Sequence, residues 1–280
     1  MPLPDPEKPS FAIPRKFDIM SHLWQSLGLC LLLSLACMVV LWLISLWRKD
    51  VSIADPFWGT GFVIMAWTSF TLNSTTSPRA ILLCILVTIW GLRLSLYLLW
   101  RNAGKKEDHR YAEMRTHHGS NFWWISFWMV FVLQGVLLWF IAMPVKIANL
   151  RSVHAPWNMI DVIGVLLWGT GFFFESVGDW QLSRFKADPA NEGKVMDHGL
   201  WRYTRHPNYF GDFCIWWGIY LISLSAGAAW TLTSPILMSI LLMRVSGVTL
   251  LESTITKRRP DYDEYRKRTS SFFPWPPSSP

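Results

Sequence analysis

Charged residues are scarce in this chain: Asp, Glu, Lys and Arg make up 16% of its 280 residues, against roughly 25% in an ordinary soluble domain. Cysteine is scarce too, and the four cysteines lie singly within apolar runs, which argues against a disulfide framework and against a metal site. The long uncharged stretches are not typical of basic nucleic-acid-binding proteins. We therefore expect the net charge of +7 to face a membrane surface or an anionic ligand.

Apolar residues make up 51% of the chain and gather in seven runs, each about as long as a bilayer-spanning helix. The runs cover residues 21–47, 56–72, 80–99, 122–143, 157–177, 209–226 and 231–251. Trp or Tyr lies near many of their ends, as is typical at a membrane interface. The pattern predicts an all-α polytopic membrane protein with a single domain over residues 21–276. The polar segment 1–20 that precedes it lacks the features of a cleaved signal peptide.

The basic residues are distributed unevenly between the two ends of these runs. Outside the runs, 18 Lys and Arg residues fall on one side and six on the other. The six are Lys8, Arg15, Lys16, Arg79, Lys146 and Arg151. The positive-inside rule places the basic side, with the C-terminal tail, in the cytoplasm. We expect an integral multi-pass protein of a bacterial inner membrane or of the endoplasmic reticulum, in contact with membrane lipid.

The densest polar block is DHGLWRYTRHPNYFGD, residues 197–212, which leads into the sixth apolar run. Pro207 suits the first turn of a helix, because its missing N–H would have no partner there. The side chains of Arg202, Arg205 and His206 would then surround the positive end of the helix dipole. Such an arrangement favours an anion, for example a phosphate group. Contact with anionic lipid headgroups is the alternative.

Two pairs of polar residues each share one helix face. Asn208 and Asp212 lie one turn apart at the start of the sixth run, and lipid headgroups do not account for them. Glu175 and Asp179 are spaced i, i+4 near the end of the fifth run. Ionisable groups at membrane depth are unfavourable, so their presence predicts a function. A structural ion pair with a neighbouring helix is the alternative for Glu175 and Asp179, and the two roles are compatible.

Further ionisable residues lie within or beside the apolar runs. Arg93, Tyr97 and Arg101 fall on nearly one face of the third run. Arg93 is too deep to be only an interfacial anchor, so we expect it to point into a polar cavity. Arg244 and Glu252 lie about two turns apart at the end of the last run and form another same-face pair.

Asp55 opens the second run. A carboxyl group against an apolar wall can be kept protonated and can then donate a hydrogen bond to a substrate carbonyl. A side-chain cap for a helix that begins at Pro56 is an equally natural explanation.

The sequence WGTGF occurs at 58–62 and again at 168–172. We interpret it as a small-residue face for close helix packing, with an inverted-repeat transporter as the alternative. The aromatic tail, residues 272–277, is placed to fold back over the site.

Several of these pieces together resemble the bacterial branch of the steroid 5-alpha-reductase family. The block GLWRYTRHPNYFGD at 199–212 carries most of the resemblance. The other matching pieces are DPFWG at 55–59, WGLR at 90–93, the stretch 175–186, and Leu251 and Glu252 followed by Tyr265 and Pro274. Their order and spacing match over about residues 50–276. Sterol reductases and isoprenylcysteine methyltransferases of the same superfamily share the short RHPxY element.

The resemblance implies a seven-helix enzyme that uses NADPH to reduce an activated carbon–carbon double bond. It implies a cofactor site mainly within 90–110 and 175–265, with Asn208 and Asp212 near the nicotinamide and as catalytic residues. The residues implied near the phosphates, ribose and adenine are Arg93, Arg101, Asp179, Lys186 and Tyr203. The other implied cofactor residues are Tyr97, Glu175, Arg202, Arg205, His206, Arg244, Glu252 and Tyr265.

The substrate implied by the resemblance is apolar, a steroid or an enone lipid, with Asp55, Trp58 and Trp90 around it and Asp55 also in catalysis. The chain departs from the family at one point: the tyrosine that partners the carboxylic acid would align near Trp90, which cannot act as an acid. We expect a monomer. The alternatives are a membrane methyltransferase that uses S-adenosylmethionine, and a transporter or structural protein whose polar pairs only join helices.

Overall fold

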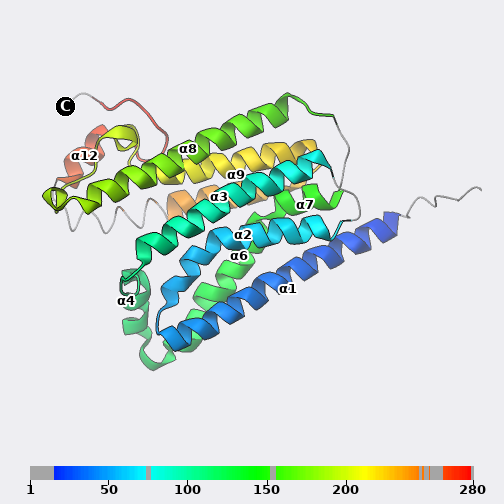
Figure 1. Ribbon diagram of the computed structural model, residues 1–280, viewed down its shortest axis with the longest axis horizontal. Helices are drawn as coiled ribbons and strands as arrows, with labels where there is room; N and C mark the ends of the chain where they lie inside the picture. Colours follow the sequence, from blue (N-terminus) through cyan, green and yellow to red (C-terminus); the bar gives the residue numbers. More distant parts are fainter. Residues whose placement is uncertain are drawn as a thin grey trace, which may run out of the picture.

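The computed structural model describes residues 16–73, 77–151, 156–245, 248, 252 and 261–278. Within these ranges the chain is helical, with short connections and no strand. The long helices lie side by side along the molecule, and the short helices α4 and α12 lie toward the same end, apart from each other (Figure 1). The prediction of an all-α protein is confirmed.

Helices cover all seven apolar runs, the last one as far as Val245. The helices of the first half are α1 (Lys16–Arg48), α2 (Ala54–Thr71), α3 (Pro78–Asn102), α4 (His109–His118), α5 (Phe122–Ser126) and α6 (Leu133–Ile141). Those of the second half are α7 (Met143–Arg151), α8 (Met159–Ala187), α9 (Pro207–Ser225), α10 (Thr233–Ile240) and α12 (Tyr262–Arg268). Two π-helical segments, η3 (Phe127–Val132) and η7 (Leu241–Val245), follow α5 and α10. The short 3-10 turns are η1 (Val51–Ile53), η2 (Gly119–Asn121), η4 (Pro189–Asn191), η5 (Gly199–Arg202) and η6 (Ala229–Leu232).

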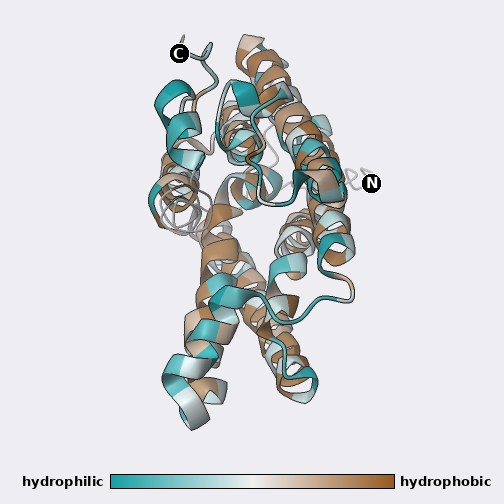
Figure 2. Cartoon of the chain, turned by 90° about the vertical axis from the view of Figure 1, so that its left-hand side faces the viewer, coloured by the Kyte–Doolittle hydropathy of each residue, from teal (hydrophilic) through white to brown (hydrophobic). Residues whose placement is uncertain are grey.

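Four of the described helical segments are long and apolar enough to cross a membrane. They are Met20–Arg48, Pro78–Asn102, His109–Ile141 and Met159–Ala187. Large apolar side chains on their outer faces are exposed, Leu32 by 66%, Leu96 by 64% and Leu166 by 65%. The long helices are largely brown in Figure 2, while hydrophilic residues gather on the short helices and loops. Such apolar outer faces fit lipid better than water, which supports a membrane protein.

Glycines bring α8 and α9 into close contact. A Cβ atom on Gly171 would lie 2.4 Å from the carbonyl oxygen of Gly211, and one on Gly164 would lie 2.9 Å from that of Gly218. On α2, a Cβ atom on Gly59 would lie 2.2 Å from the carbonyl oxygen of Gly91 on α3. These distances leave no room for a side chain. The small-residue interpretation of the two WGTGF copies is therefore confirmed at Gly59 and Gly171.

Two arginines of α3 form ion pairs with α8. At the first turn of each helix, Arg79 Nε donates to Asp161 Oδ1 at 2.9 Å and Arg79 Nη2 donates to Asp161 Oδ2 at 2.8 Å. Fourteen residues further along both helices, Arg93 contacts Glu175. Equal steps on both helices show that α3 and α8 run parallel. The two bridges are about 21 Å apart along the helix axis, so they fix both the spacing and the register of the helices.

The segment after the fourth apolar run differs from its prediction as an extramembrane loop. It forms α7, in which residues 143–149 are all buried. The Lys146 side chain is fully buried, its Nζ donates to the carbonyl oxygen of Trp139 at 2.7 Å, and it lies over the Trp139 ring. Lys146 and Arg79, two of the six cations on the less basic side, are thus buried within the protein. Lys8 and Arg15 lie outside the described residues.

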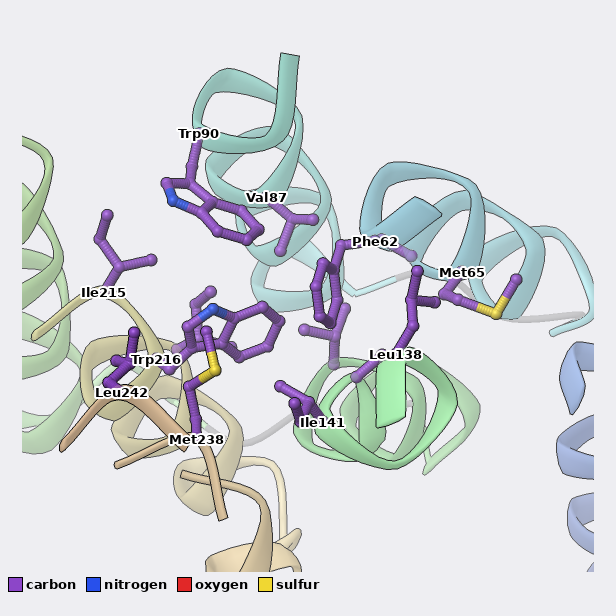
Figure 3. Close-up of a cluster of buried hydrophobic side chains, with 14 of the residues drawn as sticks. Phe62, Met65, Val87, Trp90, Leu138, Ile141, Ile215, Trp216, Met238 and Leu242 are labelled. Atoms are coloured by element: carbon purple, nitrogen blue, oxygen red, sulfur yellow. The ribbon is translucent and has the colours of Figure 1, made fainter. Parts of the chain in front are cut away.

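An aromatic cluster occupies the centre of the bundle (Figure 3). Phe62 of α2 packs against Trp216 of α9 with ring centroids 4.5 Å apart, and Trp90 of α3 meets Trp216 edge-on at 5.3 Å. Leu138 and Ile141 of α6 lie on the neighbouring side. The three rings are almost completely buried. Trp90 is notable because its indole nitrogen points away from the apolar core, toward α8.

Replacement of Gly171 by alanine tests the close contact between α8 and α9. The added methyl group would overlap backbone atoms of α9, and we expect the unfolding free energy to fall by about 1–3 kcal/mol, the usual effect of overpacking. The matched control is Gly169→Ala, because nothing lies within 4 Å of a Cβ atom there. That variant should be neutral or more stable, since alanine favours helix. Equal unfolding curves in detergent for both variants would contradict the packing described.

Candidate functional site

An arginine on α3 holds two carboxylates on α8. Arg93 Nη1 donates to Glu175 Oε1 at 2.8 Å, and Nη2 donates to Asp179 Oδ2 at 2.7 Å. Trp90 Nε1 donates to Glu175 Oε2 at 2.9 Å, and Asn208 Nδ2 of α9 donates to Asp179 Oδ1 at 3.2 Å. We call these five residues the carboxylate cluster. It joins five sequence-predicted site residues in one network, with every carboxylate oxygen bonded, although Trp90 was predicted beside the substrate and not beside Glu175.

The side of this cluster toward the C-terminal ends of α3 and α8, which we predict to face the cytoplasm, is more exposed to solvent. Tyr97 lies beside Arg93 and Arg101, whose guanidinium carbons are 5.7 Å and 5.9 Å from its ring centroid. The Tyr97 hydroxyl is 3.2 Å from Ser183 Oγ. In the described part of the chain, Arg101 has no carboxylate within salt-bridge distance, and its Nε donates to Asn102. Lys186 is exposed at the end of α8, and its charge acts on Asp179.

Asp212 leaves an acceptor without a partner next to the carboxylate cluster. It lies one helical turn after Asn208, and its Oδ1 atom is buried with no hydrogen bond to any described residue. Trp216, one turn further along α9, has a buried indole nitrogen that interacts with Asp212 but does not complete a hydrogen bond of good geometry with its Oδ1 atom. Glu175 acts on Asp212 electrostatically. Buried polar atoms normally have partners, so the incompletely bonded Oδ1 atom of Asp212 favours a bound ligand.

The predicted anion site around Arg205 and His206 contains a carboxylate of the chain itself. Arg205 Nε donates to Glu252 Oε1 at 2.8 Å, and His206 Nε2 is 3.1 Å from the same oxygen. Arg205 Nη1 also donates to the carbonyl oxygens of Arg266 and Thr269 at 2.9 Å and 2.6 Å. We call these contacts the tail cluster. They tie the entrance of α9 to the C-terminal segment, and Pro207 occupies the first turn as predicted.

Other contacts complete this attachment of the tail. The Tyr265 hydroxyl donates to the carbonyl oxygen of Trp201, and Thr204 Oγ1 donates to that of Phe272 at 2.8 Å. Phe272 packs edge-on against Phe213 of α9. The aromatic tail therefore folds back onto α9, as the sequence indicates. Lys257, Arg258 and Arg259, which precede α12, lie outside the described residues.

Asp55 accepts two hydrogen bonds and caps no helix. Helix α2 begins at Ala54, one residue before it, so the N-cap explanation is wrong. The Tyr111 hydroxyl donates to Asp55 Oδ1 at 2.6 Å, and Arg110 Nη2 donates to Oδ2 at 2.7 Å. Asp108 also binds Arg110, at 2.9 Å. Asp55 therefore lies against a guanidinium and a tyrosine hydroxyl, and not against the apolar wall considered from the sequence.

The remaining predicted residues lie apart from these groups. Arg202 and Tyr203 are exposed on and just after η5. Arg244 is exposed on η7, while Glu252 pairs with Arg205 and His206. Trp58 packs edge-on against Phe62 at the side of the aromatic cluster.

Three residues of the site were not singled out from the sequence. Arg110 and Tyr111 bind Asp55, and the ring of Tyr209 stacks on that of His206. The first two lie 55 and 56 residues from Asp55 along the chain, so no helical spacing links them to it. Tyr209 stands within the polar block and three residues before Asp212, which is a spacing that places both on one helix face. That signal was available in the sequence.

The tail cluster makes stability depend on pH. Burial lowers the pKa of His206 from its ordinary value of 6.5 and outweighs the hydrogen bond to Glu252, which raises it. Burial would raise the pKa of Glu252, but the hydrogen bonds from His206 and Arg205 outweigh it and hold the pKa at about 2. Both groups therefore bind fewer protons in the folded state than in the unfolded state, and their contribution to stability falls with acidification.

We expect the thermal unfolding midpoint in detergent to fall as the pH is lowered below about 6.5, the ordinary pKa of histidine. The contribution of Glu252 should be lost between its ordinary pKa of 4.5 and its folded pKa of about 2. His206→Gln should flatten the first step, whereas His198→Gln, at an exposed histidine, should leave it in place. A midpoint independent of pH between 8 and 5 would count against the buried neutral imidazole.

Comparison with known proteins adds a family but no activity. An uncharacterized protein of the fission yeast Schizosaccharomyces pombe, C594.04c, is 26% identical over 280 aligned positions, which cover 87% of this chain and 78% of the relative. No solved structure matches the chain. The family model described as a protein of unknown function, DUF1295, matches residues 41–269. This match covers the carboxylate cluster, the tail cluster and Asp55, and the chain therefore belongs to the DUF1295 family.

Proposed function

We propose that this protein is a membrane-embedded, NADPH-dependent reductase that transfers hydride to the activated C=C bond of an apolar enone, such as a 3-oxo-Δ4 steroid or an enone lipid. The observation that carries the proposal is the buried Oδ1 atom of Asp212, which lacks a well-formed hydrogen bond in the described residues and lies beside the carboxylate cluster. At this position a polar network from α3, α8 and α9 meets an aromatic core. Resemblance to the steroid 5-alpha-reductase family supports the same activity.

The residues present fit a nicotinamide dinucleotide phosphate. Asp212 offers an acceptor, and Asn208 offers an amide, for a carboxamide group. Arg101 has no carboxylate partner among the described residues, so its guanidinium is available for a phosphate. When bound, the cofactor would supply the hydride. The protein would supply a rigid polar frame and a water-excluding aromatic wall, in which hydrogen bonds to a developing enolate are strong.

Membrane topology follows from the same proposal. We place all seven apolar helical segments across the membrane, with the end that carries α4 and α12 in the cytoplasm. This end is basic in sequence, and NADPH is a cytoplasmic anion. The apolar substrate would enter from the lipid side, toward Phe62, Trp90 and Trp216, because a flat apolar ligand suits a pocket of aromatic side chains.

Equilibrium binding to the purified protein tests the proposal. NADPH should bind with measurable affinity and S-adenosylmethionine should not, by fluorescence or calorimetric titration in detergent or nanodiscs. Asn208→Ala and Asp212→Ala should each weaken NADPH binding about tenfold, the effect of one lost hydrogen bond to a polar ligand. The control is Asn191→Ala, which removes an amide that contacts only the carbonyl oxygen of Phe185 among described residues.

Three results would separate the candidate functions. Retention of S-adenosylmethionine in place of NADPH would favour the methyltransferase. Binding of neither would favour a transporter or a structural protein. Unchanged NADPH affinity in both variants would place the cofactor elsewhere in the chain. Oxidation of NADPH with androst-4-ene-3,17-dione, or with other enones in a mass-spectrometric screen, would identify the substrate class.

A further inference from the structure

Three tyrosine hydroxyls lie around the candidate site, and they differ in their partners. The Tyr97 hydroxyl is bonded to Ser183, and the Tyr111 hydroxyl donates to Asp55. Tyr209, in the second residue position after Pro207 at the start of α9, has no hydrogen-bond partner for its hydroxyl anywhere in the described ranges. Of these three hydroxyls, only that of Tyr209 is thus available to a ligand.

Charged groups from four helices act on Tyr209. The cations are Arg101 of α3 and Arg110 of α4, and the carboxylates are Asp179 of α8 and Asp212 of α9. Tyr209 thus feels the charges of both the carboxylate cluster and the Asp55 group. In the described part of the chain, no hydrogen bond or ion pair joins these two sets of residues directly.

The Tyr209 ring is held in place while its hydroxyl remains free. Its face stacks on the His206 ring, with centroids 5.5 Å apart and planes 5° apart. Glu252 holds the His206 ring in turn. The backbone nitrogen of Tyr209 donates to Asn208 Oδ1 at 3.1 Å. An unpaired hydroxyl on a fixed ring, three residues before Asp212 and its unpaired Oδ1 atom on the same helix, is placed to act as a general acid.

We propose that Tyr209 is the catalytic acid of the reductase, which protonates the reduced substrate. This inference rests on the proposed function. In the step, the β-carbon of the enone receives hydride from the reduced nicotinamide, which is left oxidised. The electron pair of the C=C bond moves toward the carbonyl group, and an enolate forms. The Tyr209 O–H bond then breaks and its proton passes to the enolate oxygen, which gives an enol that tautomerises to the saturated ketone; the phenolate left on Tyr209 takes a proton from water.

Tyr209→Phe removes the hydroxyl and keeps the ring that stacks on His206. Because no protein hydrogen bond is lost, the variant should fold and bind NADPH with a Kd within about twofold of wild type. Its kcat with the enone that wild type reduces should fall about 100-fold or more, since general acids contribute 10²–10⁴-fold. Tyr220→Phe is the matched control: Tyr220 lies on the same helix, its hydroxyl contacts Ala229, and kcat should be unchanged.

A second measurement needs no turnover. 2-Naphthol, whose hydroxyl imitates an enolate oxygen, should bind the NADP⁺-loaded protein in nanodiscs more tightly than naphthalene does. Tyr209→Phe should remove about tenfold of this preference, the upper effect of one lost hydrogen bond between hydroxyl groups. Both ligands are titrated by fluorescence. Naphthalene enters the lipid of the nanodisc but cannot make the hydroxyl contact with Tyr209, so its titration serves as the reference for partition into lipid.

Each outcome decides the inference. Wild-type kcat in Tyr209→Phe, or an unchanged preference for 2-naphthol, would overturn it. Weaker NADPH binding with unchanged kcat would make Tyr209 a cofactor ligand and not an acid. If wild type binds no NADPH, the proposed function itself fails and the inference fails with it. That result is distinct from the first two, which require normal cofactor binding.

Discussion

The structure depends on one arginine, Arg93, that pairs with two carboxylates within an apolar helix bundle. A charge at membrane depth is unfavourable unless a partner and hydrogen bonds compensate for it. Arg93 meets this requirement with Glu175 and Asp179 together, and Trp90 and Asn208 bind the remaining carboxylate oxygens. The pairs can form only if α3, α8 and α9 take one relative position. An electrostatic requirement thus determines the arrangement of three helices.

Close helix contacts maintain that position from the other side. The glycines of α8 and α9 let the two backbones touch at the level of Glu175: a Cβ atom on Gly211 would lie 2.5 Å from the Glu175 nitrogen. At the far end, the Arg79–Asp161 bridge sets the register of α3 against α8. Apolar packing alone leaves a helix free to slide by small amounts in lipid. Here the ion pairs and the backbone contacts oppose sliding at both ends.

The sequence predicts helices and faces well, because both follow from local periodicity. The apolar runs became helices, and the i, i+4 spacing of Glu175 and Asp179 placed both on the face that Arg93 meets. Partners are harder to predict, since they depend on how distant segments meet. Glu252 binds Arg205, 47 residues away, and the acceptor site of Asp55 is filled from α4. Burial of Lys146 was equally unpredictable, because a basic residue between two runs is typical of a loop.

The contacts of Arg205 have a consequence for the order of synthesis. Its carbonyl partners belong to Arg266 and Thr269, which leave the ribosome more than sixty residues after Arg205. Until then, the entrance of α9 lacks the bonds that hold it, even if all the apolar helices are already in the membrane. Insertion and maturation are therefore separate events in this chain. A ribosome that stalls before residue 266 would leave Arg205 without these two carbonyl acceptors, and the entrance to α9 unfinished.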